Sequence, residues 1–104
     1  MDFSYLNSIS GGDKEFIVEF IGAIETSTLP LVGEMMEQFS EGNHKRVGEL
    51  AHQVKPTIVM LGLEGIKTIE AINEDPESAT EEMIQQVKGE LEQGIDQIRA
   101  NYAV

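Results

Sequence analysis

The chain has 104 residues, of which 40% are hydrophobic, with no cysteine and a formal net charge of −12 at pH 7. This length fits one domain around a single core, spanning residues 1–104. The lack of cysteine excludes disulfides and thiolate chemistry, and the negative charge argues against nucleic acid or an anionic membrane as a partner. No run approaches the roughly 20 apolar residues of a membrane span, and the N-terminus lacks the features of a signal peptide, so we expect a cytoplasmic protein.

The first forty residues predict a short N-terminal helix or turn and then a long helical region. Phe3–Leu6 precedes a Ser-Gly-Gly loop that ends in Asp13, a good N-cap for a helix. Pro30 leaves two outcomes open, because it can open a second helix capped by Thr28 or kink one long helix. Gly42-Asn43 ends the region. The apolar positions that step by three and four are Phe16, Ile17, Phe20, Ile21, Ile24, Leu31, Met35 and Phe39.

The rest of the chain predicts three more helices. Asn43 caps the first of them, and Gly62 is a plausible stop. A short helix over 63–72 follows and is broken at Asn73-Glu74-Asp75-Pro76. Ser78-Ala79-Thr80-Glu81 has the spacing of a capping box for a last helix. Apolar residues at helical spacing are Val47, Leu50, Ala51, Val54, Ile58 and Leu61 in the first, and Ile84, Val87, Leu91, Ile95, Ile98 and Tyr102 in the last.

Each of these helices has a single apolar face to bury. We therefore predict an all-α protein, an antiparallel four-helix bundle with an extra short N-terminal helix or turn. If no apolar helix face is left exposed, the protein should be a monomer. Met1 and the short tail after the last helix favour a free-standing protein over a domain of a larger one.

His52 lies on the central bundle helix, but on the face opposite its apolar stripe, where it should be exposed to water. Two positions next to it on the helical wheel, Gly48 and Pro56, carry no long side chain, which would let a partner close over the imidazole ring. Val59 is an apolar residue on the same face and would serve as a docking contact. The remaining neighbours on this face are Lys45, Glu49 and Lys55.

The charges of the chain are unevenly distributed. Between Asn43 and Gly62, Lys45, Arg46 and Lys55 face a single acid, Glu49, whereas the other eighteen acids lie elsewhere. The one basic segment thus coincides with the histidine helix. This indicates a partner that is anionic or has an acidic surface, although three cations on one solvated helix face are also common.

Several chemistries do not fit His52. There is no nucleophile motif such as G-x-S-x-G. Glu49 and His52 form a Glu-x-x-His motif, which di-iron bundles use in pairs, but those ligands point into the bundle and these two point outward. The other histidine, His44, directly follows a helix break and has no lysine three residues later. We expect no metal site, no cofactor and no enzyme that turns over a substrate alone.

An exposed imidazole can instead accept a phosphoryl group. It is largely neutral near pH 7 and so keeps a nucleophilic nitrogen lone pair. Lys55, on the adjoining turn, can neutralise the phosphoryl oxygens, and Lys45 lies about two turns back on the same side. Pro56 removes the N–H that would bond the His52 carbonyl, so we also expect a bend between these two residues.

The segment Ala51-His52-Gln53-Val54-Lys55-Pro56-Thr57, followed by Leu61-Gly62-Leu63, resembles the A-H-x-[LIV]-K-[GPS]-[ST] … [LM]-G signature of histidine-containing phosphotransfer (HPt) domains. Ser10-Gly11-Gly12-Asp13 with Phe16 also resembles the start of the first long helix in that family. The resemblance implies a four-helix bundle whose exposed histidine exchanges a phosphoryl group with aspartates of receiver domains. Pro56 stands where many members of the family have glycine, which bears on the local helix geometry.

On this resemblance, His52 is the phosphorylation site and Lys55 the stabilising cation. The partners it implies are receiver domains of response regulators or a hybrid histidine kinase. The acid cluster and its Mg²⁺ belong to the partner. An alternative reading is a helical adaptor that binds a receiver or kinase domain through the same face without being phosphorylated.

Overall fold

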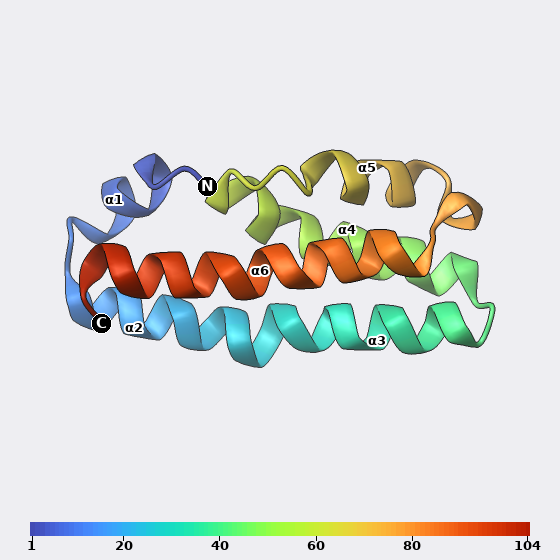
Figure 1. Ribbon diagram of the computed structural model, residues 1–104, viewed down its shortest axis with the longest axis horizontal. Helices are drawn as coiled ribbons and strands as arrows, with labels where there is room; N and C mark the ends of the chain where they lie inside the picture. Colours follow the sequence, from blue (N-terminus) through green and yellow to red (C-terminus); the bar gives the residue numbers. More distant parts are fainter.

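A computed structural model describes all 104 residues and contains helices and turns but no strand, which confirms the predicted all-α class. Figure 1 shows the helices lying lengthwise along an elongated molecule of 42 × 21 × 18 Å. The elements in order are α1 (Ser4–Ser10), α2 (Lys14–Ala23), the π-helical turn η1 (Ile24–Thr28), α3 (Leu29–Ser40), α4 (His44–Leu61), α5 (Ile66–Glu74), the 3-10 turn η2 (Pro76–Ser78) and α6 (Glu81–Tyr102).

The region around Pro30 forms one continuous helix rather than two. α2, η1 and α3 together run from Lys14 to Ser40, and in η1 the N–H of Leu29 donates to the carbonyl of Ile24, one residue further back than in an α-helix. Thr28 makes no cap, so of the two outcomes left open at Pro30 the separate second helix capped by Thr28 does not occur. Its hydroxyl instead lies 3.1 Å from that of Thr57 on α4, and both side chains are buried.

This 27-residue helix is long and apolar enough to cross a membrane by length and composition alone, with a window of mean hydropathy 1.4. Polar residues interrupt this helix, so no unbroken apolar run in the sequence indicates the property. In the structure one side of the helix packs against α4 and α6 and contributes Ile17, Ile21, Ile24, Val32 and Met35 to the core. The same length and composition occur in core helices of soluble proteins.

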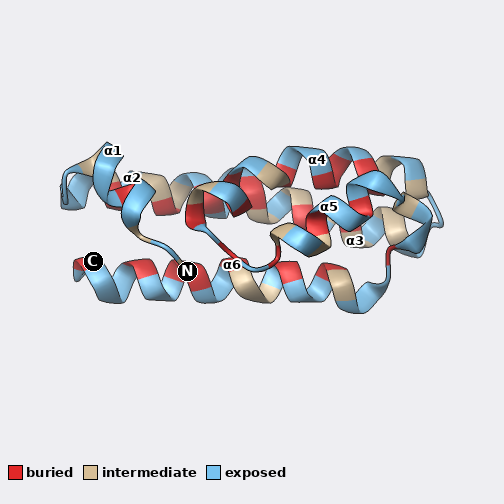
Figure 2. Ribbon diagram, turned by 90° about the horizontal axis from the view of Figure 1, so that it is seen from above, coloured by how far each residue is buried: buried red, intermediate tan, exposed pale blue.

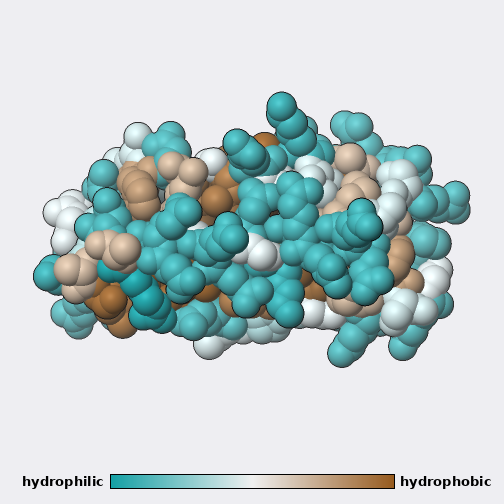
Figure 3. All heavy atoms as spheres, viewed as in Figure 1, coloured by the Kyte–Doolittle hydropathy of each residue, from teal (hydrophilic) through white to brown (hydrophobic).

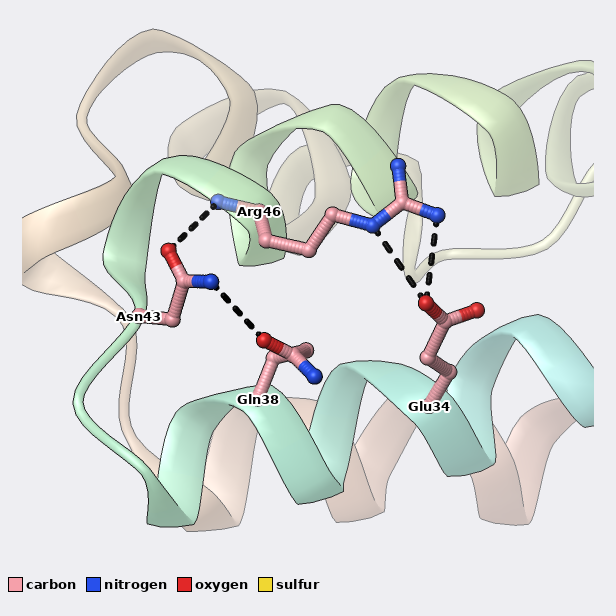
Figure 4. Close-up of polar contacts among 4 residues, drawn as sticks. All are labelled: Glu34, Gln38, Asn43 and Arg46. Carbon is pink, nitrogen blue, oxygen red and sulfur yellow. Dashed lines mark hydrogen bonds and ion pairs between the residues drawn. The ribbon is translucent and has the colours of Figure 1, made fainter.

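α4 begins and ends where the sequence predicts. The Asn43 side chain accepts a hydrogen bond from the Arg46 N–H and donates one to Gln38 at the end of α3, so the cap also ties the two helices together (Figure 4). Gly62 ends α4 with a φ of 61°, which a residue with a Cβ rarely adopts. The helix continues without interruption through Pro56.

α5 is held between α4 and α6. Its first turn is fixed by Glu90 of α6, whose carboxylate accepts from the N–H of Gly65 at 2.9 Å. Its inner side contributes Ile69 and Ile72 to the core. After α5 ends, the turn η2 follows and lies against α4.

The last helix is capped by Thr80, whose hydroxyl accepts from the N–H of Met83. The predicted capping box at Ser78 is wrong, because Ser78 belongs to η2 and its hydroxyl donates to the Asp75 carbonyl. At the other end of α6, Tyr102 is buried and donates its hydroxyl hydrogen to Asn7 of α1. The predicted N-terminal helix thus covers this end of the molecule.

The buried hydrophobic residues form a single cluster on the inward sides of the helices (Figure 2). All six apolar positions predicted for α4, and all six predicted for α6, belong to it. The outward side of α6, which lies in front in Figure 1, is mostly hydrophilic, with apolar atoms gathered near both ends (Figure 3). Helical periodicity therefore predicted the inward faces of α4 and α6 correctly.

Candidate functional site

His52 is exposed on α4, on the side opposite the buried stripe. Lys45, Glu49 and Pro56 are also exposed, and the Val59 side chain is 56% exposed. The structure thus brings the histidine, two charged residues and an apolar residue together on one accessible helix face. Glu49 and His52 both point away from the core, and no group of three or more potential metal ligands lies together.

Gly48 does not lie on the accessible face, and its predicted exposure is wrong. It is buried, and Pro76 of η2 packs directly over it. A Cβ at this position would lie 2.6 Å from the Cγ of Pro76. Glycine is needed here because η2 approaches α4 closely. Packing within the molecule therefore explains why this position carries no side chain, and no partner is needed to explain it.

Lys55 has a partner within the molecule. Its ammonium nitrogen lies 3.8 Å from a carboxylate oxygen of Glu70 on α5, with the two side chains 37% and 49% exposed. Such a half-exposed pair is weak and opens easily. Lys55 therefore lies one helical turn after His52 but is shared with an acid.

The basic segment is less positive than its sequence indicates. Arg46 donates from two nitrogens to one carboxylate oxygen of Glu34 on α3, at 3.1 and 3.3 Å (Figure 4). Of the three cations in this helix, Lys45 alone makes no ion pair. The local excess of positive charge is thus largely balanced by acids that come from the neighbouring helices.

An open groove of about 490 Å³ runs beside His52, between α4 and the end of α5. Its walls are polar or charged apart from Gly48 and Pro76. The residues that line it are Lys45, Gly48, Glu49, His52, Gln53, Asn73 and Pro76. The imidazole therefore borders an open recess formed by residues of α4, the end of α5 and η2.

His44 differs from His52 in its surroundings. It is half-buried at the start of α4, its ring lies edge-on to Phe39, and its Nδ1 is buried without a hydrogen-bond partner. The residue three positions later is the buried Val47. Of the two histidines, His52 alone is exposed and has a lysine three residues later on the same helix.

Glu70, Asn73 and Pro76 were missed by the sequence reasoning. They lie 15 to 28 residues from the α4 residues that they approach, and no local spacing links them. A signal existed only for Pro76, in the helix-breaking run that ends α5. The sequence thus identified the α4 half of the site but not the half that comes from α5 and η2.

Comparison of the chain with protein-family models, with curated proteins and with solved structures gave no significant match. The resemblance to histidine-containing phosphotransfer domains therefore rests on the motif residues of α4 and its flanks and on Ser10–Phe16 at the start of α2.

Proposed function

We propose that this protein is a cytoplasmic histidine phosphotransfer protein, which carries a phosphoryl group on His52 between aspartates of receiver domains. We also propose that its helices form the antiparallel four-helix bundle of that family. The four helices would be the continuous helix Lys14–Ser40, α4, α5 and α6, with α1 as an addition. The observation that carries the proposal is an exposed imidazole with a lysine one turn away, beside an open groove.

In the proposed reaction, an imidazole nitrogen of His52 attacks the phosphorus of a partner's aspartyl phosphate. The N–P bond forms as the P–O bond to the aspartate breaks, the carboxylate leaves with the electron pair, and the ring loses a proton to water. Lys55 stabilises the negative oxygens of the transferred group. The partner supplies the acid cluster and Mg²⁺, so the protein contributes a positioned nucleophile and a cation.

The exposed face of α4 supports docking of a compact receiver domain. Lys45, Glu49, Pro56 and Val59 surround His52 without covering it. Lys45 retains a free charge for an acidic partner surface, and Val59 offers an apolar contact. Gly48 would act only through the backbone at the floor of the groove.

The decisive experiment mixes the protein with receiver domains that carry a radioactive phosphoryl group. Label should pass to the wild type as an acid-labile, base-stable adduct and should be absent from His52→Ala. The matched control is His44→Ala, which removes the other histidine of α4 and should leave labelling intact.

If His52→Ala is labelled as well as the wild type, the site assignment is wrong. If the wild type binds receiver domains but none of them labels it, the protein is the non-phosphorylated adaptor instead.

A further inference from the structure

α5 forms a second wall beside the exposed face of α4. Three pairs of residues at intervals of about one turn define it: Glu70 is ion-paired with Lys55, Asn73 lines the same groove as His52, and Pro76 packs over Gly48. Residue numbers rise along α5 and η2 as they fall along α4, so the two segments run antiparallel. The turn of α5 from Glu70 to Asn73 therefore lies alongside the turn of α4 from His52 to Lys55.

This alignment gives Lys55 two competing partners. Without a phosphoryl group, its ammonium is paired with the Glu70 carboxylate at 3.8 Å. A phosphoryl group on His52 would bring nearly two further negative charges to the preceding turn of the same helix. A lysine has three N–H donors but carries a single compact positive charge. Its attraction to the Glu70 carboxylate therefore weakens its attraction to the phosphoryl oxygens.

We propose, on the basis of the proposed function, that Glu70 raises the tendency of His52 to give up its phosphoryl group. Glu70 is a positioning residue that acts through Lys55. In the phosphorylated state it withholds part of the positive charge of Lys55 from the phosphoryl oxygens. In the onward step, a carboxylate oxygen bonds to phosphorus, the P–N bond breaks, and the ring nitrogen keeps the electron pair and takes a proton from water.

The test measures the equilibrium distribution of phosphoryl label between this protein and a receiver domain that exchanges with it. Because both proteins are mostly free at low concentration, this distribution depends on the stability of the phosphohistidine and not on docking. Glu70→Gln should shift the distribution about twofold to threefold toward His52, which is the scale of a half-exposed ion pair. Glu92→Gln is the matched control, since Glu92 is an exposed α6 residue without an ion pair and loses the same charge.

A double-mutant cycle separates the lysine-mediated effect from a general charge effect. In a Lys55→Ala background, Glu70→Gln should shift the distribution no more than Glu92→Gln does. The proposal is overturned if Glu70→Gln matches Glu92→Gln in the wild-type background, or if its full effect persists without Lys55.

Chemical phosphorylation distinguishes failure of this proposal from failure of the proposed function. Phosphoramidate transfers its phosphoryl group to histidine nitrogen with loss of ammonia and needs no protein partner. The half-life of the adduct on His52 should then be about twofold longer in Glu70→Gln than in the wild type or in Glu92→Gln. If no receiver domain labels the wild type, the proposed function fails, while equal half-lives in all three proteins would overturn the role of Glu70.

Discussion

The two faces of α4 differ in what determines their environment. The six apolar positions that helical periodicity assigns to the inward face are all buried, and the buried Thr57 lies beside them. The outward face is exposed around His52 but covered at one edge, where Pro76 lies over Gly48 and Glu70 pairs with Lys55. An outward position on a helical wheel is therefore accessible only where no neighbouring element covers it.

Gly48 and Pro56 illustrate the difference. They lie four residues before and four residues after His52, and the sequence assigned both the same role of leaving room for a partner. Pro56 is exposed, whereas Gly48 is buried beneath η2. Substitutions at the buried Gly48 and on the inward face should therefore affect stability, whereas substitutions at the exposed and half-exposed residues around His52 should affect the proposed phosphotransfer.

The largest effect on stability is expected from Gly48→Ala. The added methyl group would lie 2.6 Å from the Pro76 ring, so η2 must move, and we expect a loss of about 2 to 3 kcal/mol in the free energy of unfolding. Urea denaturation followed by circular dichroism measures it. Gly33→Ala is the control, since no atom would crowd its Cβ in α3, and it should stabilise the protein by about 0.5 to 1 kcal/mol. Equal effects of the two variants would show that Gly48 is not covered.

A smaller loss is expected from Thr57→Val on the inward face. This change keeps the shape of the side chain but leaves the buried Thr28 hydroxyl without its partner at 3.1 Å. The free energy of unfolding should fall by about 1 to 2 kcal/mol. The double variant Thr28→Val/Thr57→Val should recover part of that loss, because neither hydroxyl then remains unpaired. A double variant less stable than Thr57→Val alone would contradict the pairing.

The smallest effect on stability is expected from Lys55→Ala. Its ion pair with Glu70 is half-exposed, so the free energy of unfolding should change by no more than about 0.5 kcal/mol. The rate of phosphotransfer to His52 should nevertheless fall, since the cation beside the phosphoryl oxygens is lost. Quench-flow measurement of label transfer, with circular dichroism on the same sample, separates the two effects. A large loss of helicity would place Lys55 among the structural residues.

Local sequence signals predicted the ends of several helices correctly. Asp13 and Asn43 cap α2 and α4 through side-chain hydrogen bonds to N–H groups two and three residues later, and Gly62 ends α4. These interactions lie within a few residues along the chain, so spacing alone reveals them. The capping box failed because two hydroxyl residues, Ser78 and Thr80, compete for one cap, and the 3-10 turn takes up the first.

Only the α4 half of the candidate site was predicted from the sequence, because local spacing relates residues of one helix and not residues of different helices. His52, Lys55 and the exposed residues around them lie on one helix, whose 3.6-residue period sets their relative directions. Nothing in that period indicates that Glu34 would balance Arg46, or that Glu70 would hold Lys55. The positive character predicted for this helix was therefore overestimated.

The amino-acid sequence by itself determined the all-α class, the inward faces of the helices and the position of His52 on an outward face. Each follows from propensity, capping and periodicity within a single helix. Only the tertiary structure decided that α2 and α3 are continuous, that Pro76 covers Gly48, and that α5 forms the other wall of the groove. Periodicity sets the direction of a side chain about its own helix axis, but the packing of helices distant in sequence decides what that side chain meets.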